Sequence, residues 1–172
     1  MPPAPASKGC SQQTRPAPKW AAPIQSLPKS HNHCAEVLGD VYGYVTQAGL
    51  SGVLVDLVYL RVSQINGCAY CLDLHTRDLP KKGLKAKKLT LVQVWREAGN
   101  LFDKRERAAL AWAETVTRVA ETAIPDEEFQ SASAVFSEKE RVDLTIAISL
   151  MNTFNRIAIG FRRAPAATLA TS

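Results

Sequence analysis

The chain has 172 residues, a length that fits one domain with short tails. Hydrophobic residues make up 46% of it, enough for a core, and no apolar run approaches the roughly 20 residues that a membrane span needs. The formal net charge of +5 is mild, and the N-terminus has no apolar segment of the secretory-signal type. We therefore expect a cytoplasmic protein that binds neither nucleic acid nor a membrane.

A proline-rich stretch opens the chain. Seven of the ten prolines fall within residues 1–30, and the missing backbone N–H of each proline works against regular structure. We predict a flexible arm over residues 1–30, a helical domain over residues 31–165 and a C-terminal tail over residues 166–172.

Beyond residue 32 the apolar residues recur at helical spacing. The first predicted helix, which Gly49 ends, has an apolar face made of Val37, Leu38, Val41, Tyr44 and Val45. Ser51 is placed to cap a second helix, and Asn66-Gly67 is a turn signal that ends it. A third, short helix is predicted from about Cys68 to Asp78.

Pro80 and a cluster of lysines come next, and we interpret this segment as a solvated linker. The cluster consists of Lys81, Lys82, Lys85, Lys87 and Lys88. No aromatic residue is interleaved with these lysines to stack on bases, which disfavours a nucleic-acid site. A fourth helix is predicted over about residues 88–97, with Leu89, Val92 and Trp95 as its apolar residues.

Two capping boxes mark the remaining long helices. Asp103 with Glu106 opens a fifth helix, and a short sixth helix follows it. Ser137 with Glu140 opens a long seventh helix, for which Gly160 supplies the stop. No segment alternates apolar and polar residues as a strand does, so the predicted fold class is all-α, a bundle of about six to seven helices.

The candidate chemistry lies between Asp56 and Asp78. Cys68 and Cys71 are three residues apart, and His75 follows Cys71 by four, so a helix places all three on one face, which we expect to be exposed. The cysteine pair also lies in the first turn of its helix, where unpaired N–H groups and the helix dipole favour a thiolate.

Two arguments disagree on which sulfur attacks an oxidant. Its position at the helix start favours Cys68, whereas the nearby His75 imidazole, as a base, favours Cys71. We prefer Cys71 as the attacked thiol and Cys68 as the resolving thiol, because a paired base is the more specific device. A sulfenic acid on one cysteine would then condense with the other to a disulfide.

The cysteine pair could also be a zinc site, an inert part of the core or a thioredoxin motif, and each of these is weaker. Structural zinc needs four ligands, usually two such pairs, and here one pair and His75 are present, so no metal is expected. Free cysteines are often inert core residues, but a histidine one turn further on argues against that. A thioredoxin fold needs a strand before the pair, and the preceding segment is predicted as a helix.

Three segments together resemble the alkyl hydroperoxidase D-like family, also called carboxymuconolactone decarboxylase-like. QINGCAYCLDLHTRD (residues 64–78) is similar to its signature, an acidic residue twelve positions before a CxxC pair and a histidine four after it. WREAGNLFDKRERAALAWAE (residues 95–114) and MNTFNR (residues 151–156) resemble later family segments. The resemblance covers about residues 34–162.

The resemblance implies an all-helical fold assembled into trimers or hexamers. It also implies peroxidase activity with a proton relay, which here would run from Asp56 through water and His75 to Cys71 and Cys68. Two positions depart from the family pattern. The usual acidic residue is Glu, one methylene longer than Asp56, and Tyr70 stands between the cysteines, where better-studied peroxidases often have His.

We therefore expect a thiol-dependent peroxidase that reduces hydrogen peroxide or organic hydroperoxides through a dithiol/disulfide cycle, with no cofactor. An external dithiol, thioredoxin-like or lipoamide-like, must regenerate the pair. Tyr70, Asn155 and Arg156 are candidate pocket residues. The alternatives are a non-catalytic redox sensor or helical assembly module, and a carboxymuconolactone decarboxylase-like enzyme, a branch that lacks the cysteine pair.

Overall fold

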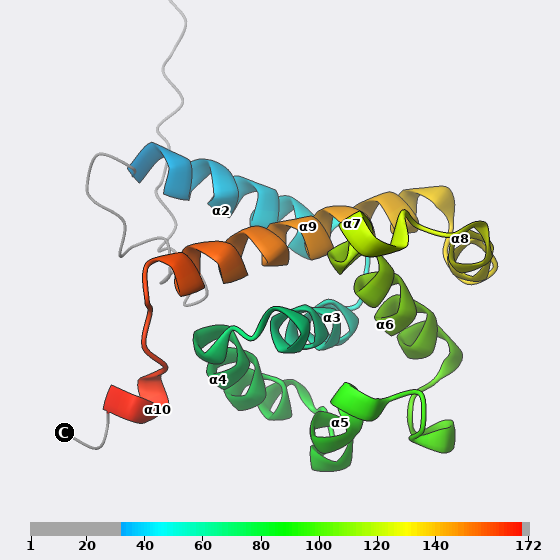
Figure 1. Cartoon of the computed structure of the whole chain (residues 1–172), viewed down its shortest axis with the longest axis horizontal. Coiled ribbons are helices and arrows are strands. Elements are labelled where there is room, and N and C mark those ends of the chain that lie inside the picture. Colours follow the sequence, from blue (N-terminus) through cyan, green and yellow to red (C-terminus); the bar gives the residue numbers. More distant parts are fainter. Residues whose placement is uncertain (1–31, 170–172) are drawn as a thin grey trace, which may run out of the picture.

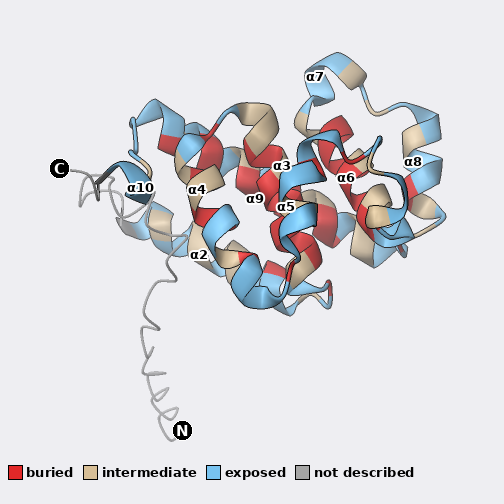
Figure 2. Ribbon diagram, turned by 90° about the horizontal axis from the view of Figure 1, so that it is seen from below, coloured by how far each residue is buried: buried red, intermediate tan, exposed pale blue. Residues whose placement is uncertain are grey.

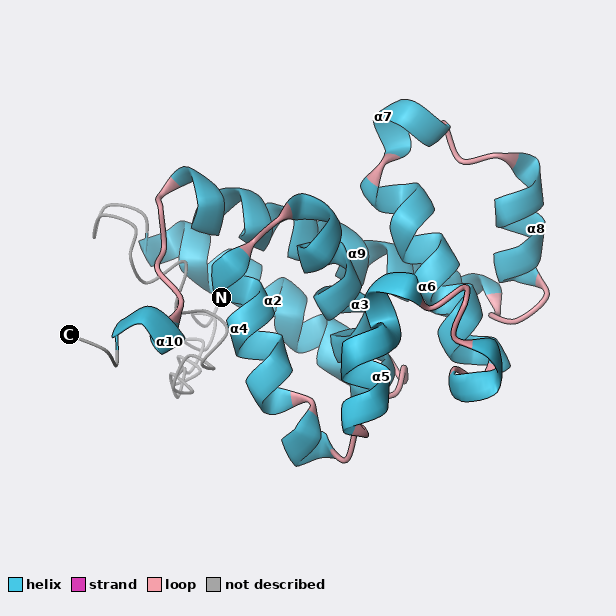
Figure 3. Ribbon diagram, turned by 60° about the horizontal axis from the view of Figure 1, so that its bottom comes forward, coloured by secondary structure: helices cyan, strands magenta, loops and turns pink. Residues whose placement is uncertain are grey.

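The computed structural model describes residues 32–169. Within this range every regular element is a helix (Figure 3), which confirms the predicted all-α class. The longer helices are α2 (Asn32–Gln47), α3 (Gly52–Asn66), α4 (Ala69–Asp78), α6 (Lys104–Thr117), α8 (Asp126–Ser133) and α9 (Glu138–Gly160). The shorter ones are α5 (Ala86–Leu91), α7 (Val119–Thr122), α10 (Ala166–Leu169) and the 3-10 turns Pro80–Lys82, Val92–Val94 and Gly99–Leu101.

The sequence also predicts a flexible N-terminal arm and no membrane span. The predicted arm over residues 1–30 lies outside the described residues. None of the helices in residues 32–169 combines the length and the hydropathy that crossing a bilayer requires.

Helix α3 is the centre of the fold. It is seen end-on in Figure 1, and it packs against α4, α6 and α9. Residues 54–60 of this helix, LVDLVYL, are all buried (Figure 2), because a helix that is apolar on almost every side must be covered by its neighbours. Asp56, the single charged residue of this run, is thereby carried into the interior.

Both predicted capping boxes are confirmed. At the start of α6 the Asp103 carboxylate accepts from the N–H of Glu106 at 2.9 Å, and the Glu106 carboxylate accepts from the N–H of Asp103 at 2.8 Å. Ser137 and Glu140 form the same pair at the start of α9. These caps satisfy N–H groups that have no partner inside the helix, and they fix where α6 and α9 begin.

The prediction of a solvated lysine linker is correct only in part: Lys81, Lys82, Lys85 and Lys87 are exposed, but the segment is not a simple linker. Part of this segment is helical, as α5, and Lys88 extends its ammonium to the Glu106 carboxylate at 2.5 Å, with only 19% of the lysine side chain exposed. Lys82 forms an ion pair with buried Asp56. Lysines with long apolar stems cover the surface here while their charged ends meet carboxylates.

The predicted fourth helix over residues 88–97 is also wrong in extent. The α-helix ends at Leu91, and residues 92–94 continue as a 3-10 turn. A 3-10 turn places residues three apart on the same side, which allows Val92 and Trp95 both to be buried while Val94 is exposed. The Trp95 indole N–H then donates to the Glu114 carboxylate of α6 at 2.9 Å, so tertiary contacts decide the local winding.

The turn between α3 and α4 sets the position of the cysteine pair. Gly67 adopts a left-handed conformation (φ 68°, ψ 31°), and the N–H of Cys68 donates to the carbonyl of Ser63 at 3.0 Å. This arrangement ends α3 and immediately begins α4, with Cys68 as the residue that caps it. A residue with a side chain is strained at such a φ even where there is space for its Cβ.

We predict that Gly67→Ala lowers the free energy of unfolding by roughly 1–2 kcal/mol, because Gly67 requires the left-handed region. Gly43 is the matched control, since it lies inside α2 and a Cβ would meet nothing within 4 Å at either glycine. Gly43→Ala should raise stability by up to about 1 kcal/mol. Urea denaturation measures both, and destabilisation of equal size in the two variants would contradict this account.

Candidate active site

The two predicted thiols meet at the start of α4. Cys68 is the N-cap residue, with extended backbone (φ −83°, ψ 93°), and Cys71 lies in the first turn. The backbone N–H of Cys71 donates to the Sγ of Cys68 at 3.4 Å. The sulfur thus takes the place that a serine or aspartate oxygen takes at other helix starts, at the end where the helix dipole favours negative charge.

Both thiols are buried, so the exposed face expected from the sequence is wrong. Cys68 is 1% exposed and Cys71 is 3% exposed, and the pair packs against Ala158 of α9 and the partly exposed Tyr70. The physical reason is the packing of α4 against α9, which covers the face that carries the thiols. His75, one turn further along α4, is likewise buried.

The surroundings separate the pKa values of the two thiols. The hydrogen bond from the Cys71 side chain, aided by the Cys71 N–H and by Asn155, lowers the pKa of Cys68 to about 7 although burial opposes this. The pKa of Cys71 is raised, because its S–H serves as the donor to Cys68 and because the group is buried. Cys68 is therefore the more acidic thiol of the pair, and it is the one that forms thiolate near neutral pH.

A buried polar cluster from α3 and α9 surrounds the sulfurs. Asn155 is fully buried, its amide N–H donates to Ser63 Oγ at 3.1 Å, and its carbonyl accepts from Asn66 at 2.9 Å. Asn155 also lowers the pKa of both thiols, and Ser63 lowers that of Cys71. This cluster fixes the position of the sulfurs and supplies hydrogen-bond donors to a developing thiolate.

A small polar cavity lies beside the same face of α4 and brings the predicted Asp56 and His75 together. Its volume is about 160 Å³. It is lined by Tyr42, Asp56, Tyr59, Leu74, His75, Asp78, Lys82, Met151 and Phe154. Two of these residues, Tyr59 and His75, each carry a buried side-chain atom, Oη and Nε2, that has no hydrogen-bond partner among the residues described.

His75 is neutral at physiological pH. Burial lowers its pKa to about 4, against the opposing effect of the Asp78 carboxylate. Its Nε2 makes no hydrogen bond within residues 32–169, and the strongest influences on the pKa of Cys71 are Cys68 and burial. The proton-accepting role that the sequence assigns to His75 toward Cys71 thus stays a prediction.

Asp56 is paired with a lysine that the sequence analysis assigned to a solvated linker. Its carboxylate forms an ion pair with Lys82, from the turn after α4. Burial raises the pKa of Asp56, and the Lys82 ammonium opposes this shift. Of the residues that line the cavity, the sequence analysis predicted only Asp56 and His75 as site residues and missed the others, Lys82 and Tyr59 among them. Tyr59 follows Asp56 by three residues, which is the helical spacing that signals a shared face.

The other candidate pocket residues lie in different places. Tyr70 lies beside the thiols, and the guanidinium of Arg163 lies 5.6 Å from its ring centroid. Arg156 is exposed and donates to its own helix, to the carbonyl oxygen of Asn152 at 2.9 Å. Of the predicted pocket residues, Tyr70 and Asn155 therefore adjoin the thiols, and Arg156 lies on the outer surface.

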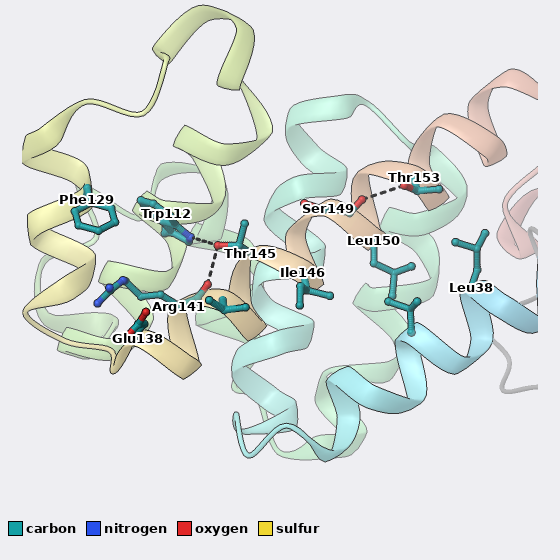
Figure 4. Close-up of a pocket in the computed structure, with 12 residues that line it drawn as sticks. Leu38, Trp112, Phe129, Glu138, Arg141, Thr145, Ile146, Ser149, Leu150 and Thr153 are labelled. Atoms are coloured by element: carbon teal, nitrogen blue, oxygen red, sulfur yellow. Dashed lines mark hydrogen bonds between the residues drawn. The ribbon is translucent and has the colours of Figure 1, made fainter.

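A larger, apolar groove lies on another face of α9 (Figure 4). Its volume is about 610 Å³, and side chains from α2, α6, α8 and α9 line it. Trp112 and Phe129 lie together at one end, and Leu38 of α2 lies at the other. Neither cysteine borders the groove, so it is separate from the thiol site.

Across residues 32–169, no group of three or more His, Cys, Asp and Glu side chains is arranged to hold a metal ion. The arrangement supports thiol chemistry, because the pKa of one sulfur is lowered to about 7 and the other thiol lies within its hydrogen-bonding reach.

The chain is similar to known proteins in sequence and in structure. The sequence model of the carboxymuconolactone decarboxylase family matches residues 32–115. The uncharacterized protein YdfG of Bacillus subtilis is 32% identical over 124 residues, which make up 72% of this chain and 84% of YdfG. A solved structure of a protein of unknown function from Agrobacterium tumefaciens, whose proposed role is that of the antioxidant defence protein AhpD, is 36% identical, with a TM-score of 0.75 over 88% of this chain and 98% of that one. The debrominase Bmp8 shares the fold, with a TM-score of 0.70 and 17% identity over 88% of this chain and 85% of its own.

We predict that acidification destabilises the protein through His75. In the unfolded chain the His75 imidazole has its ordinary pKa of 6.5, whereas in the folded protein its pKa is about 4. Stability is therefore full above pH 6.5 and falls as the pH drops toward 4, by about 3 kcal/mol for this pKa difference. His75→Gln should remove this part of the pH dependence, and His33→Gln, at an exposed position, should keep it. Chemical denaturation between pH 4 and 7 measures the effect, and identical profiles for wild type and His75→Gln would refute it.

Proposed function

The chain belongs to the carboxymuconolactone decarboxylase family, and from this premise we propose that it is a thiol-dependent peroxidase that reduces hydrogen peroxide or organic hydroperoxides. The observation that carries the proposal is the contact between Cys68 and Cys71 at the start of α4, together with the opposite shifts of their pKa values, lowered for Cys68 and raised for Cys71. The AhpD role proposed for the Agrobacterium protein supports it.

Cys68 is the attacking group in this scheme. Its thiolate attacks one peroxide oxygen, the S–O bond forms, the O–O bond breaks, and the other oxygen leaves as alkoxide or hydroxide. Cys71 is the nearest proton donor, because its S–H already points at Cys68. Transfer of that proton gives an alcohol or water, a sulfenic acid on Cys68 and a thiolate on Cys71.

The second step uses the thiolate just formed. Cys71 attacks the sulfenic sulfur, a disulfide forms, and hydroxide leaves and takes up a proton to become water. The two cysteines are three residues apart on one helix turn, so the disulfide forms without a large rearrangement. An external dithiol, thioredoxin-like or lipoamide-like, then reduces the disulfide and completes the cycle.

This assignment reverses the order preferred from the sequence. The preference for Cys71 as the attacked thiol rested on His75 as its base, and the Nε2 of His75 makes no hydrogen bond among the described residues. The electrostatics support Cys68, whose pKa is lowered to about 7 while that of Cys71 is raised. The more acidic thiol is the more abundant thiolate, and the thiolate is the nucleophile.

Burial of the thiols favours one other function. A buried pair that oxidises only when its cover moves would suit a redox sensor, which is oxidised once and then read by a partner. A decarboxylase, another of the alternatives, is disfavoured because that branch lacks the cysteine pair. Debromination is the activity of Bmp8, whose 17% identity supports a common fold alone. Repeated turnover with a dithiol separates the peroxidase from the sensor.

We also propose that the protein is a homo-oligomer and that a second copy covers the apolar groove. A single chain leaves Val142 of this groove 52% exposed and Phe129 42% exposed. Apolar patches of this kind on soluble proteins are usually interfaces, and most soluble oligomers are built from identical copies. Trimers or hexamers are the assemblies expected from the family resemblance.

The peroxidase proposal predicts distinct behaviour for each cysteine variant. With cumene hydroperoxide and an excess of dithiol, Cys68→Ser should lose at least about a thousandfold in turnover, because the nucleophile is gone. Cys71→Ser should react once and accumulate a sulfenic acid that dimedone traps. Cys34→Ser, at an exposed position, is the control and should match wild type.

Peroxide consumption and mass spectrometry measure these outcomes. In the wild type, at a fixed excess of hydroperoxide, the pseudo-first-order rate of Cys68 oxidation should rise with pH through about 7, the pKa of Cys68. Wild-type protein that is oxidised once and never cycles would support the sensor instead. Undiminished turnover in both Cys68→Ser and Cys71→Ser would reject thiol chemistry at this site.

The oligomer proposal predicts that a charge in the groove separates the copies. Val142→Asp should yield monomers, because the carboxylate would have to be desolvated in the interface. Val119→Asp is matched in chemistry and exposure, lies outside the groove, and should leave the assembly intact. Analytical ultracentrifugation measures the oligomeric state of each variant. A monomeric wild type, or unchanged assembly in Val142→Asp, would contradict the proposal.

A further inference from the structure

The two thiols belong to a small apolar cluster whose outer member is Tyr70. Cys68, Cys71 and Ala158 of α9 are each at most 3% exposed. Their polar neighbour Asn155 is also fully buried. Tyr70, which packs against the same cluster, is partly exposed. Among these neighbours of the sulfurs Tyr70 is thus the one that borders solvent, and its ring lies on the outer side of the pair.

The ring of Tyr70 is restrained by Arg163. The guanidinium lies 5.6 Å from the ring centroid, within the range in which a cation attracts an aromatic face. Burial raises the pKa of Tyr70, and the positive charge of Arg163 opposes this shift, which is a second sign that the two groups interact. A cation–π contact near the surface is weak, so it restrains the ring without fixing it.

The end of α9 directs Arg163 toward this position. Arg162 has a left-handed backbone (φ 52°), and its N–H donates to the carbonyl of Ile159 at 3.0 Å. The N–H of Arg163 donates to the carbonyl of Ala158 at 2.8 Å. These two bonds form a Schellman motif, which ends the helix and turns the chain back.

The chain beyond this turn is tied to α4. The N–H of Ala166 donates to the carboxylate of Asp73 in α4 at 3.0 Å, and α10 packs against α4 (Figure 1). Residues 161–169 therefore form a strap that is attached to α9 at one end and to α4 at the other. The strap presents Arg163 to the ring of Tyr70.

The opposite side of the thiol pair, toward the end of α3, is closed more firmly. The amide of Asn66 donates to the side-chain oxygens of Asn152 and Asn155, both at 2.9 Å. A reagent that entered there would have to break these hydrogen bonds, whereas displacement of the Tyr70 ring breaks a weak contact with Arg163. Entry past Tyr70 is the less costly route.

We infer that Tyr70, restrained by Arg163, is the specificity-determining residue of the thiol site, and that it favours small oxidants such as hydrogen peroxide over bulky organic hydroperoxides. A partly exposed side chain changes rotamer rapidly, so the ring opens the site transiently. The opening that a reagent needs grows with its size. The identity of the oxidant rests on the proposed peroxidase function, whereas the restriction on access does not.

Two alkylating agents that differ in size test access without any peroxide. Iodoacetamide and its N-phenyl analogue iodoacetanilide are both neutral, and both react with a thiolate by loss of iodide. Mass spectrometry of the digested, labelled chain measures the rate at each cysteine, and exposed Cys34 supplies the reference ratio of the two reagents. Relative to that reference, Cys68 of the wild type should disfavour the larger reagent by about tenfold or more, the range in which the size of a pocket discriminates.

Three variants locate the source of the discrimination. Tyr70→Ala should remove it, and Tyr70→Phe should retain it, because the ring is kept. Arg163→Ala should weaken it by about two- to fivefold, the value of an exposed cation–π contact. Arg162→Ala is the matched control, since it removes the neighbouring exposed arginine, and it should match wild type.

The pH profile of iodoacetamide labelling separates loss of the ring from loosening of α4. The midpoint at Cys68 should stay near 7 in every variant, because Cys71 and the start of α4 are unchanged. Discrimination that is lost together with a midpoint moved toward the ordinary value of 9 would overturn the role of Tyr70. So would equal discrimination in wild type and Tyr70→Ala. If Tyr70→Ala does not fold, a wild type without discrimination, or one unchanged by Arg163→Ala, would overturn it.

Peroxides connect the inference to the proposed function. The rate constant of Cys68 oxidation by hydrogen peroxide, relative to that by cumene hydroperoxide, should fall by about tenfold or more in Tyr70→Ala. Discrimination between the alkylating agents without consumption of either peroxide would refute the proposed function and leave the access role of Tyr70 in place. Consumption of both peroxides in a ratio that Tyr70→Ala does not change would refute the specificity and leave the proposed function in place.

Discussion

The hydrogen bond from the backbone of Cys71 to the sulfur of Cys68 is the interaction on which the site depends. It makes a cysteine the cap of α4, and it places that sulfur where the helix dipole and the neighbouring thiol both favour negative charge. The left-handed Gly67 makes this possible, because it ends α3 and is followed directly by Cys68, the N-cap residue of α4. An ionised sulfur with a protonated one beside it is the minimum that dithiol chemistry requires.

The second constraint is that this chemistry lies inside the protein. Helix α3 is apolar on nearly all sides and must be buried, and it carries Asp56, Tyr59 and Ser63 into the core with it. Asp56 is paired there with Lys82, and Ser63 accepts a hydrogen bond from Asn155. Tyr59 borders the cavity. Burial also keeps His75 neutral. The packing of α3, α4 and α9 therefore influences the protonation states of the groups in the site.

Sequence reasoning predicted the parts of the fold that follow from local chemistry. The capping boxes at Asp103 and Ser137 and the turn at Gly67 are satisfied by residues within a few positions, so the sequence alone located them. The lysine segment and the helix beyond Leu91 were mispredicted in part, because distant carboxylates such as that of Glu106 decide their structure. The sequence also located the cysteine pair on one helix face. It did not predict that this face is buried, because the burial depends on the packing of α9, which no local sequence pattern indicates.

The central claim is tested most directly by the product of a single oxidation. One equivalent of hydrogen peroxide is added to the fully reduced chain, which is then alkylated, digested and analysed by mass spectrometry. The account predicts one disulfide that joins Cys68 to Cys71, with Cys10 and Cys34 alkylated and therefore still reduced. Peroxide left unconsumed, or oxidation confined to Cys10 and Cys34, would contradict it.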